Sequence, residues 1–263
     1  MEEHICIACG TQYPPAAEPP EACPICDDPR QYVPPEGQRW TTMRELADGH
    51  TNVVRTDGDF VGIGTDPSFA IGQRALLVPF GDRHLLWDCI SLLDDETAAE
   101  VERRGGLAGI AISHPHYYSS MVEWARRFDC PIHLHAADAE WVMRPDPAIA
   151  QWDGEQLELG HGVTLIRGGG HFPGGTMLHR DGVLLTGDII QVIPDRTHVG
   201  FMWSYPNLVP LPDAEVQRIA AAVDPFAFEA IYGAWWGRVI PSDAKAVVRR
   251  SAARYTRALA GEL

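Results

Sequence analysis

The sequence has no long hydrophobic run and almost no lysine. No stretch approaches the roughly 18 consecutive apolar residues that a membrane helix needs, so we expect no membrane partner. Acidic residues outnumber basic ones by 36 to 21, and the formal net charge is −15. Because a field of that sign repels a phosphate backbone, nucleic acid is not an expected substrate. We expect a small-molecule substrate instead, and an anionic one remains possible if a bound metal reverses the local potential.

The N-terminus also lacks the features of a secretory signal. The segment Met1-Glu-Glu-His-Ile-Cys6 carries acidic residues where a signal peptide would be basic, and no apolar segment follows it. We therefore expect the protein to stay in the cytoplasm. Hydrophobic residues make up 45% of the chain, which is typical of a folded protein with one sizeable core, here with a small added module.

Four of the six cysteines form two CxxC pairs, Cys6 with Cys9 and Cys23 with Cys26. In a reducing compartment this arrangement indicates a metal site rather than disulfides. Prolines crowd residues 14–35, and a domain below roughly 40 residues normally needs a metal or disulfide staple. We therefore predict a four-cysteine metal-knuckle domain over residues 1–39. Cys89 and Cys130 stand alone in apolar surroundings and are expected to be buried.

The segment around the four cysteines resembles the short rubredoxin-like domain of rubrerythrins. The resemblance rests on Gly10 after the second cysteine, on Tyr13 and on the Cys-Pro-x-Cys form of the second pair. Tetrahedral all-thiolate sites accept zinc or iron. Zinc would make the module a structural or docking unit, for a protein partner or a second copy of the chain, whereas iron would make it an electron-transfer unit with a redox partner. Zinc is favoured because structural four-cysteine zinc sites are common.

A second domain is predicted over residues 40–263. Short apolar runs bounded by Gly, Asp and Pro indicate strands, and acidic starts with basic or glycine ends indicate helices. The expected strands cover residues 60–63, 75–78, 85–87, 107–112, 132–135, 163–166, 176–178 and 183–185. The expected helices cover residues 94–106, 119–128, 138–143, 213–222 and 243–259. Strands and helices mixed in this order predict an α/β fold of the layered αββα type.

Histidine and aspartate side chains follow several of these strands. His114 and His116 come directly after a buried strand, and residues two apart in an extended chain point to the same side. His171 lies in a glycine-rich segment, where the backbone can turn sharply beside a ligand. Asp188 follows another buried strand. Three imidazoles and one carboxylate at strand ends can together hold zinc or iron.

The order of these motifs resembles the metallo-β-lactamase superfamily, which includes glyoxalase II-type thioesterases, lactonases and β-lactamases. The motifs are Ser-His114-Pro-His116, Gly-Gly-His171-x-Pro-Gly-Gly and Leu-Leu-Thr-Gly-Asp188. The segment Leu85-Leu-Trp-Asp88 resembles the strand that opens that fold, and the similarity covers residues 52–242. The resemblance implies a four-layered αββα sandwich with the cysteine module, a rubredoxin-like zinc ribbon, in front of it. It also implies a metal centre at the three histidines and the aspartate.

The chain departs from the family pattern at the second metal position. The family motif His-x-His-x-Asp-His ends in Tyr118 and Ser119 here, and Ala234 stands where a histidine near the C-terminus is usual. Neutral tyrosine and serine are weak ligands and alanine is none, so we predict a mononuclear site. A single zinc ion can still lower the pKa of bound water to about 7 and so supply hydroxide at neutral pH.

Catalytic roles are predicted for three residues. Asp188 could accept a proton from the bound water. Tyr118 could donate a hydrogen bond to an oxyanion, or fill the vacated pocket instead. His198 lies in the long loop after Asp188, where the family often builds its substrate pocket. The predicted substrate-binding residues are His135, Trp203, Tyr205 and Trp235. Packing in the core is the alternative for the aromatic ones.

Three functions are compatible with these residues. The favoured one is metal-dependent hydrolysis of a small ester, thioester, lactone or amide. The second is a mononuclear iron oxidoreductase, because His114, His171 and Asp188 make a two-histidine, one-carboxylate triad. Persulfide dioxygenases of the superfamily resemble it, but they keep the Asp-His half of the first motif. Flavodiiron proteins, which also pair this fold with rubredoxin, carry a glutamate at the position of His116. The third is a non-catalytic binding or scaffold protein.

Overall fold

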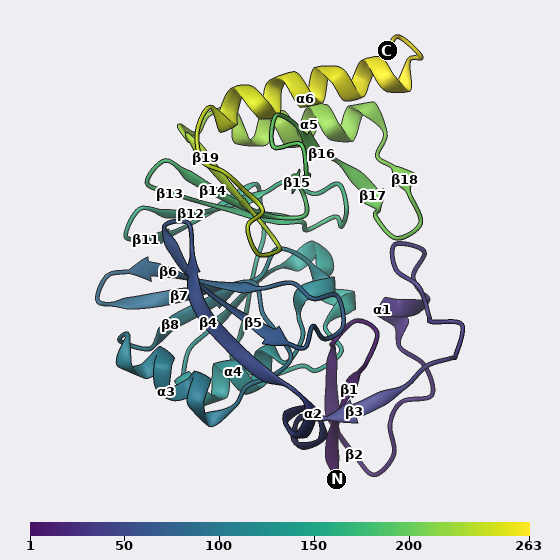
Figure 1. Cartoon of the computed structure of the whole chain (residues 1–263), viewed down its shortest axis with the longest axis vertical. Coiled ribbons are helices and arrows are strands. Elements are labelled where there is room, and N and C mark those ends of the chain that lie inside the picture. Colours follow the sequence, from purple (N-terminus) through teal and green to yellow (C-terminus); the bar gives the residue numbers. More distant parts are fainter.

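The computed structural model describes the whole chain, residues 1–263, and its larger part is built in four layers (Figure 1). Two β-sheets face each other. The outer face of the first sheet is covered by α3 (Asp95–Arg103) and α4 (Met121–Phe128), and the outer face of the second by α5 (Asp213–Val223) and α6 (Ala244–Leu259). The predicted αββα sandwich is confirmed.

The first sheet has seven strands in the order β10-β9-β8-β7-β6-β5-β4. Its strands are β4 (Thr51–Asp57), β5 (Phe60–Asp66), β6 (Ala75–Phe80), β7 (Arg83–Trp87), β8 (Leu107–Ala111), β9 (Ile132–His135) and β10 (Ile149–Trp152). Neighbouring strands from β4 to β7 are antiparallel, and those from β7 to β10 are parallel. The crossovers from β7 to β8 and from β8 to β9 carry α3 and α4, and the one from β9 to β10 carries a 3₁₀ segment, Ala136–Trp141.

The second sheet has six strands in the order β11-β12-β13-β14-β19-β20. Its strands are β11 (Gln156–Gly160), β12 (Val163–Arg167), β13 (Thr176–Arg180), β14 (Val183–Gly187), β19 (Ala230–Gly233) and β20 (Val239–Ile240). Between β14 and α5 the chain forms two small ribbons, β15 (Gln191–Val192) with β16 (Val199–Gly200) and β17 (Met202–Ser204) with β18 (Val209–Pro210). No helix is long and apolar enough to cross a membrane.

Each pair of neighbouring layers encloses its own apolar cluster, and β7 shows how the sequence arranges this. Leu86 points outward and packs in one cluster with Val101 of α3. Leu85 and Trp87 point inward and pack in another with Leu178 of the second sheet. A third cluster lies between the second sheet and the pair α5 and α6. Successive strand residues face opposite sides, and each fully buried large side chain contributes about 1.5–3 kcal/mol.

A buried ion pair joins the two sheets near their ends. Arg74 Nε lies 2.6 Å from Asp57 Oδ2, and Arg74 Nη1 donates to the carbonyl oxygen of Gly233 at 2.8 Å. The arginine side chain is fully buried and that of Asp57 is 8% exposed. Each charge therefore depends on the other for compensation.

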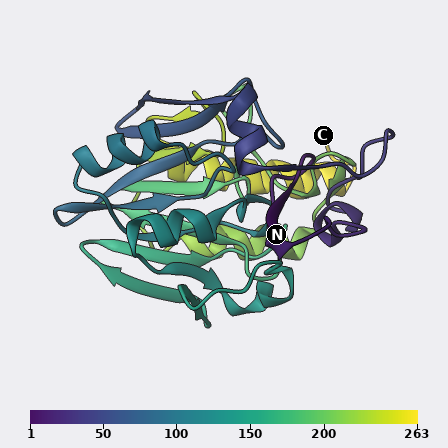
Figure 2. The ribbon, with the colours of Figure 1, turned by 90° about the horizontal axis from the view of Figure 1, so that it is seen from below.

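The N-terminal module packs at one end of the two-sheet body (Figure 2). Its three-stranded sheet has the order β2-β1-β3, from β1 (Glu2–Cys6), β2 (Gln12–Ala16) and β3 (Trp40–Thr42). The short α1 (Pro24–Asp27) carries the second cysteine pair, and α2 (Met43–Gly49) leads into the sandwich. Thr42 and Glu45 cap α2 reciprocally. Because β3 uses residues 40–42, the module shares this strand with the connecting segment, and the boundary between residues 39 and 40 stays a prediction.

Candidate metal centres

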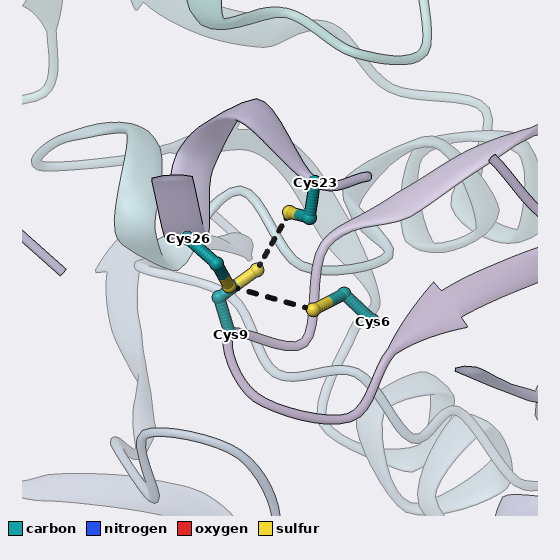
Figure 3. A group of neighbouring side chains, drawn as sticks. All are labelled: Cys6, Cys9, Cys23 and Cys26. Atoms are coloured by element: carbon teal, nitrogen blue, oxygen red, sulfur yellow. Dashed lines mark hydrogen bonds between the residues drawn. The ribbon is translucent and has the colours of Figure 1, made fainter. Parts of the chain in front are cut away.

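The four cysteines lie together and are buried, as the two CxxC pairs predict (Figure 3). Cys6 Sγ lies 3.6 Å from Cys26 Sγ, and Cys9 Sγ lies 3.6 Å from Cys23 Sγ. Sulfurs around a tetrahedral metal with bonds of about 2.3 Å are about 3.8 Å apart. The spacing therefore fits one metal ion.

Local turns and hydrogen bonds hold these thiols in place. Gly10, at φ +81°, lets its amide donate to the carbonyl oxygen of Cys6 at 2.8 Å and closes the first knuckle. Tyr13 Oη donates to Cys23 Sγ at 3.2 Å, and Gln38 Nε2 donates to Cys6 Sγ at 3.1 Å. Donors aimed at sulfur stabilise the thiolate form that binds metals.

The three predicted histidines form the second centre. His114 and His116 follow β8, and His171 lies in the loop between β12 and β13. Their ring nitrogens lie within 4.8 Å of one another, and all three residues are buried. His116 Nδ1 is 3.1 Å from His171 Nε2, close to the separation of about 3.3 Å for two imidazole ligands of one tetrahedral zinc. The cluster can thus hold a single metal ion.

The protonation states also suit metal binding. His171 Nδ1 is 2.7 Å from the carbonyl oxygen of Trp203, which can only accept, so Nδ1 carries the proton and Nε2 keeps its lone pair. Burial lowers the pKa of His171 to about 4 and that of His116 well below its ordinary value. Buried His116 Nε2 has no hydrogen-bond partner. These two rings are therefore neutral at pH 7, as ligands must be.

Asp188 lies beside the histidines at the end of β14. One carboxylate oxygen contacts His114 Nε2, and the other accepts a hydrogen bond from Tyr117 Oη at 3.1 Å. Tyr205 Oη donates to the backbone carbonyl of Asp188 at 2.7 Å. Burial alone would raise the pKa of Asp188, but the neighbouring His114 outweighs it and holds the pKa well below its ordinary value. The structure thus presents an anchored carboxylate next to the histidine cluster, and its role as a ligand stays a prediction.

The tyrosine that contacts Asp188 is Tyr117, which the sequence analysis did not single out. Residues Pro115–Tyr117 form a short 3₁₀ turn rather than extended chain, which directs Tyr117 toward the centre. Tyr118 is buried in the core and lines a small hollow against Thr11 and Gln12 of the N-terminal module. It therefore packs in the core there, and a role of its hydroxyl in the reaction stays a prediction.

Ser119 and Ala234, which stand where the family pattern has metal ligands, make structural contacts. Ser119 Oγ donates to the carbonyl oxygen of Cys89 at 3.3 Å, and Ala234 is buried in the apolar core. The next residue, Trp235, donates from Nε1 to the carbonyl oxygen of Ile71 at 3.3 Å and packs 6.5 Å from the ring of Tyr117. Trp235 therefore packs against Tyr117, which in turn contacts Asp188.

The remaining predicted site residues divide into two groups. Trp203 and Tyr205 hold His171 and Asp188 through the bonds given above. His135 is engaged with the backbone of Gly154, at 3.0 Å, and its ring packs against Trp152. His198 pairs with Asp195 at 3.0 Å and lines a hollow against α6. The structure does not bring His135 or His198 into the histidine cluster.

Arg30 is a residue of the centre that the sequence reasoning missed. It comes from the N-terminal module, yet its Nη1 donates to the carbonyl oxygen of His171 at 3.3 Å. Its guanidinium lies 3.8 Å from the ring centre of Phe172 and is held by both carboxylate oxygens of Asp28. Nothing in its proline-rich surroundings signals this contact, because it spans 141 residues of sequence.

Comparison with known structures places the fold. The DIM-1 metallo-β-lactamase superposes with a TM-score of 0.60 at 12% identity, over 79% of this chain and 98% of that one. TTHA1623 in a di-iron-bound form superposes with a TM-score of 0.51 at 18% identity, over 68% of this chain and 93% of that one. A flavo di-iron protein mutant from Thermotoga maritima superposes with a TM-score of 0.52 at 13% identity, over 78% of this chain and 62% of that one. The chain therefore has the metallo-β-lactamase fold with a four-cysteine module that fits a zinc ribbon.

The family assignment comes from sequence. No protein-family profile matches the chain. The chain is 45% identical over 272 residues to the uncharacterized protein YmaE of Bacillus subtilis (strain 168). The alignment covers 100% of this chain and 99% of that protein. The chain belongs to the YmaE family.

Proposed function

We propose that the chain is a mononuclear metal-dependent hydrolase of a small ester, thioester, lactone or amide. The observation that carries the proposal is the buried convergence of His114, His116 and His171 beside an anchored carboxylate. Ser119, a weak neutral ligand that bonds the carbonyl oxygen of Cys89, and Ala234, which has no ligand atom, favour a single ion. A metal at this centre would supply a Lewis acid and make water more acidic.

The residues around the centre have separable roles in this proposal. Asp188 is held as an anion by His114 and Tyr117. A carboxylate with so low a pKa is a weak proton acceptor. Because His114 Nδ1 accepts the amide of His116, Nε2 is the nitrogen left for a metal. We therefore assign Asp188 to binding the same metal and orienting the attacking water, rather than to removing its proton. Tyr205 fixes the backbone of Asp188.

Metal analysis of variants tests the centre. The purified chain should contain two metal ions, and His114→Ala should lose one while the ion held by the four cysteines stays. His179→Ala is the matched control, because His179 lies on β13 and bonds only the carbonyl oxygen of Ala227. His114→Ala should also abolish hydrolysis across a panel of chromogenic esters and thioesters. Unchanged metal content in His114→Ala would refute the centre, and absence of a second metal in the unaltered chain would favour the scaffold function.

An iron oxidoreductase is the second candidate, and one observation favours it. Trp141 packs against the cysteine cluster, and its ring centre lies 5.7 Å from that of Phe172. Phe172 in turn lies 5.6, 4.8 and 5.1 Å from the rings of His114, His116 and His171. The two metal centres are thus joined by a continuous aromatic contact through which an electron could pass.

Iron content and reduction kinetics decide between the two candidates. The redox function requires iron at both centres and a slower transfer between them in Trp141→Leu, followed by stopped-flow absorbance. Zinc at both centres, together with hydrolysis that Trp141→Leu leaves intact, would exclude it.

A further inference from the structure

A hollow of about 410 Å³ lies directly outside the His171 loop. Three arginines line it, Arg30 from the N-terminal module, Arg167 at the end of β12 and Arg218 from α5. We call it the arginine hollow. Of its lining residues, Trp203 was predicted from the sequence to bind substrate, and the three arginines were not.

The arginine hollow and the histidine centre share a wall. Gly170 and Pro173, which line the hollow, flank His171 and Phe172 in the chain. Trp203 also lines it, and its carbonyl oxygen holds His171 Nδ1 at 2.7 Å. Arg30 lines it and donates to the carbonyl oxygen of His171. A molecule in the hollow is therefore separated from the histidine cluster by the loop that carries His171.

The guanidinium groups are held in place and keep free donors. Arg30 is 8% exposed and is fixed by Asp28 and the ring of Phe172. Arg167 donates to the carbonyl oxygen of Pro173 at 3.0 Å and to Glu155 at 3.1 Å. Arg218 donates from Nε and Nη2 to Glu215. Each guanidinium has five N–H donors, so these bonds leave at least two in each arginine for a ligand.

The charges of the hollow favour an anion. Three arginines and two glutamates line the hollow, and Asp28 balances Arg30, so an anion is favoured where it takes the place of the two glutamates. The side chains of Glu155 and Glu215 are 68% and 41% exposed. Exposed ion pairs of this kind are weak, so a ligand oxyanion can replace the glutamates without leaving a buried charge unpaired. Arginine is well suited to such a ligand because its fork matches carboxylate and phosphate.

We propose that the arginine hollow binds a carboxylate or phosphate group of the substrate. The anion site stands on its own, whereas its assignment to a substrate rests on the proposed hydrolase function. The substrate class is then a small anionic ester, thioester, lactone or amide. The N-terminal module contributes to recognising it through Arg30.

Calorimetric titration with two probes, inorganic phosphate and succinate, tests the site on the full chain with both metal centres loaded. Comparing the probes tells a phosphate site from a carboxylate site. The double variant Arg167→Gln/Arg218→Gln should weaken binding of the preferred probe by about tenfold or more, as expected for loss of charged hydrogen bonds. The control is Arg126→Gln, because Arg126 of α4 also forms an ion pair, with Asp146, but does not line the hollow. This variant should bind the probe as the unaltered chain does.

The same titration on His114→Ala separates the hollow from the metal. Binding should persist there, because the arginines and not the metal hold the anion. Equal affinities in the double variant and the control, absence of binding by both probes, or loss of binding in His114→Ala would each overturn the assignment. Activity is not the readout, so a failure to find hydrolysis would contradict the proposed function and leave the anion site standing.

Discussion

The exchange of Tyr117 for phenylalanine should weaken metal binding at the histidine centre without disturbing the fold. Tyr117 is fully buried, and its hydroxyl donates to Asp188 at 3.1 Å. Burial raises the pKa of Tyr117 well above its ordinary value, so the hydroxyl stays protonated and keeps donating at working pH. A hydrogen bond to a charged group contributes about 1.5–3 kcal/mol. Because that bond orients the carboxylate that contacts His114, we expect about 10- to 100-fold weaker metal binding in Tyr117→Phe.

Cobalt(II) titration of the full chain gives the measurement. Cobalt held by thiolates shows a charge-transfer absorption that a histidine-held ion lacks, so the two centres are followed separately. Tyr118→Phe is the matched control, since the neighbouring tyrosine packs against the N-terminal module and has no bond to Asp188. Its affinity should change by no more than about twofold. Equal affinities in the two variants, or a larger loss in Tyr118→Phe, would refute the reasoning.

Three further predictions concern stability. In the metal-free protein the unfolded chain protonates His171 near its ordinary pKa of 6.5 and the folded chain only near about 4, so stability should fall as the pH drops through this window. The loss approaches about 3 kcal/mol, and urea unfolding should show a shallower pH dependence in His171→Gln. Arg74→Ala should lower the free energy of unfolding in urea by about 3–5 kcal/mol, because Asp57 is left buried without its partner. A larger loss of stability in the double variant Arg74→Ala/Asp57→Ala than in Arg74→Ala would contradict this. Cys23→Ser should lose the metal of the N-terminal module. Trypsin should then cut after Arg30, which is only 8% exposed in the folded protein. Resistance to trypsin equal to that of the control Cys130→Ser would show that the module folds without metal.

Much of the fold was predictable because its strands are short apolar runs with clear ends. The last helix, expected over residues 243–259, is Ala244–Leu259. The expected helix over residues 138–143 is instead a 3₁₀ segment, Ala136–Trp141. Asp138 has non-helical dihedral angles there, and its carboxylate accepts the amide of Gly174 at 2.7 Å. That contact with a distant loop overrides local helix preference, and no local pattern reveals it.

The site was predictable to the extent that its residues end strands. His114, His116 and His171 meet because strand ends of both sheets gather at one edge. Tyr117 was not predicted, because its direction depends on the turn that follows β8, which an extended-chain argument does not describe. Arg30 was missed because its position depends on how the module docks, which is a property of two surfaces and not of a motif.

The docking of the module has a consequence for how the chain is made. Ser204 Oγ donates to the carbonyl oxygen of Arg30 at 3.2 Å, and Asn207 Nδ2 donates to that of Pro29 at 2.9 Å, across 174 and 178 residues of sequence. Contacts of such separation form late, because the intervening loop must be closed first. On the ribosome the cysteine module emerges before the two sheets, yet the β17–β18 ribbon that it contacts emerges only after both sheets have largely been synthesised. We therefore expect the contact between Arg30 and the carbonyl oxygen of His171 to form among the last steps of folding.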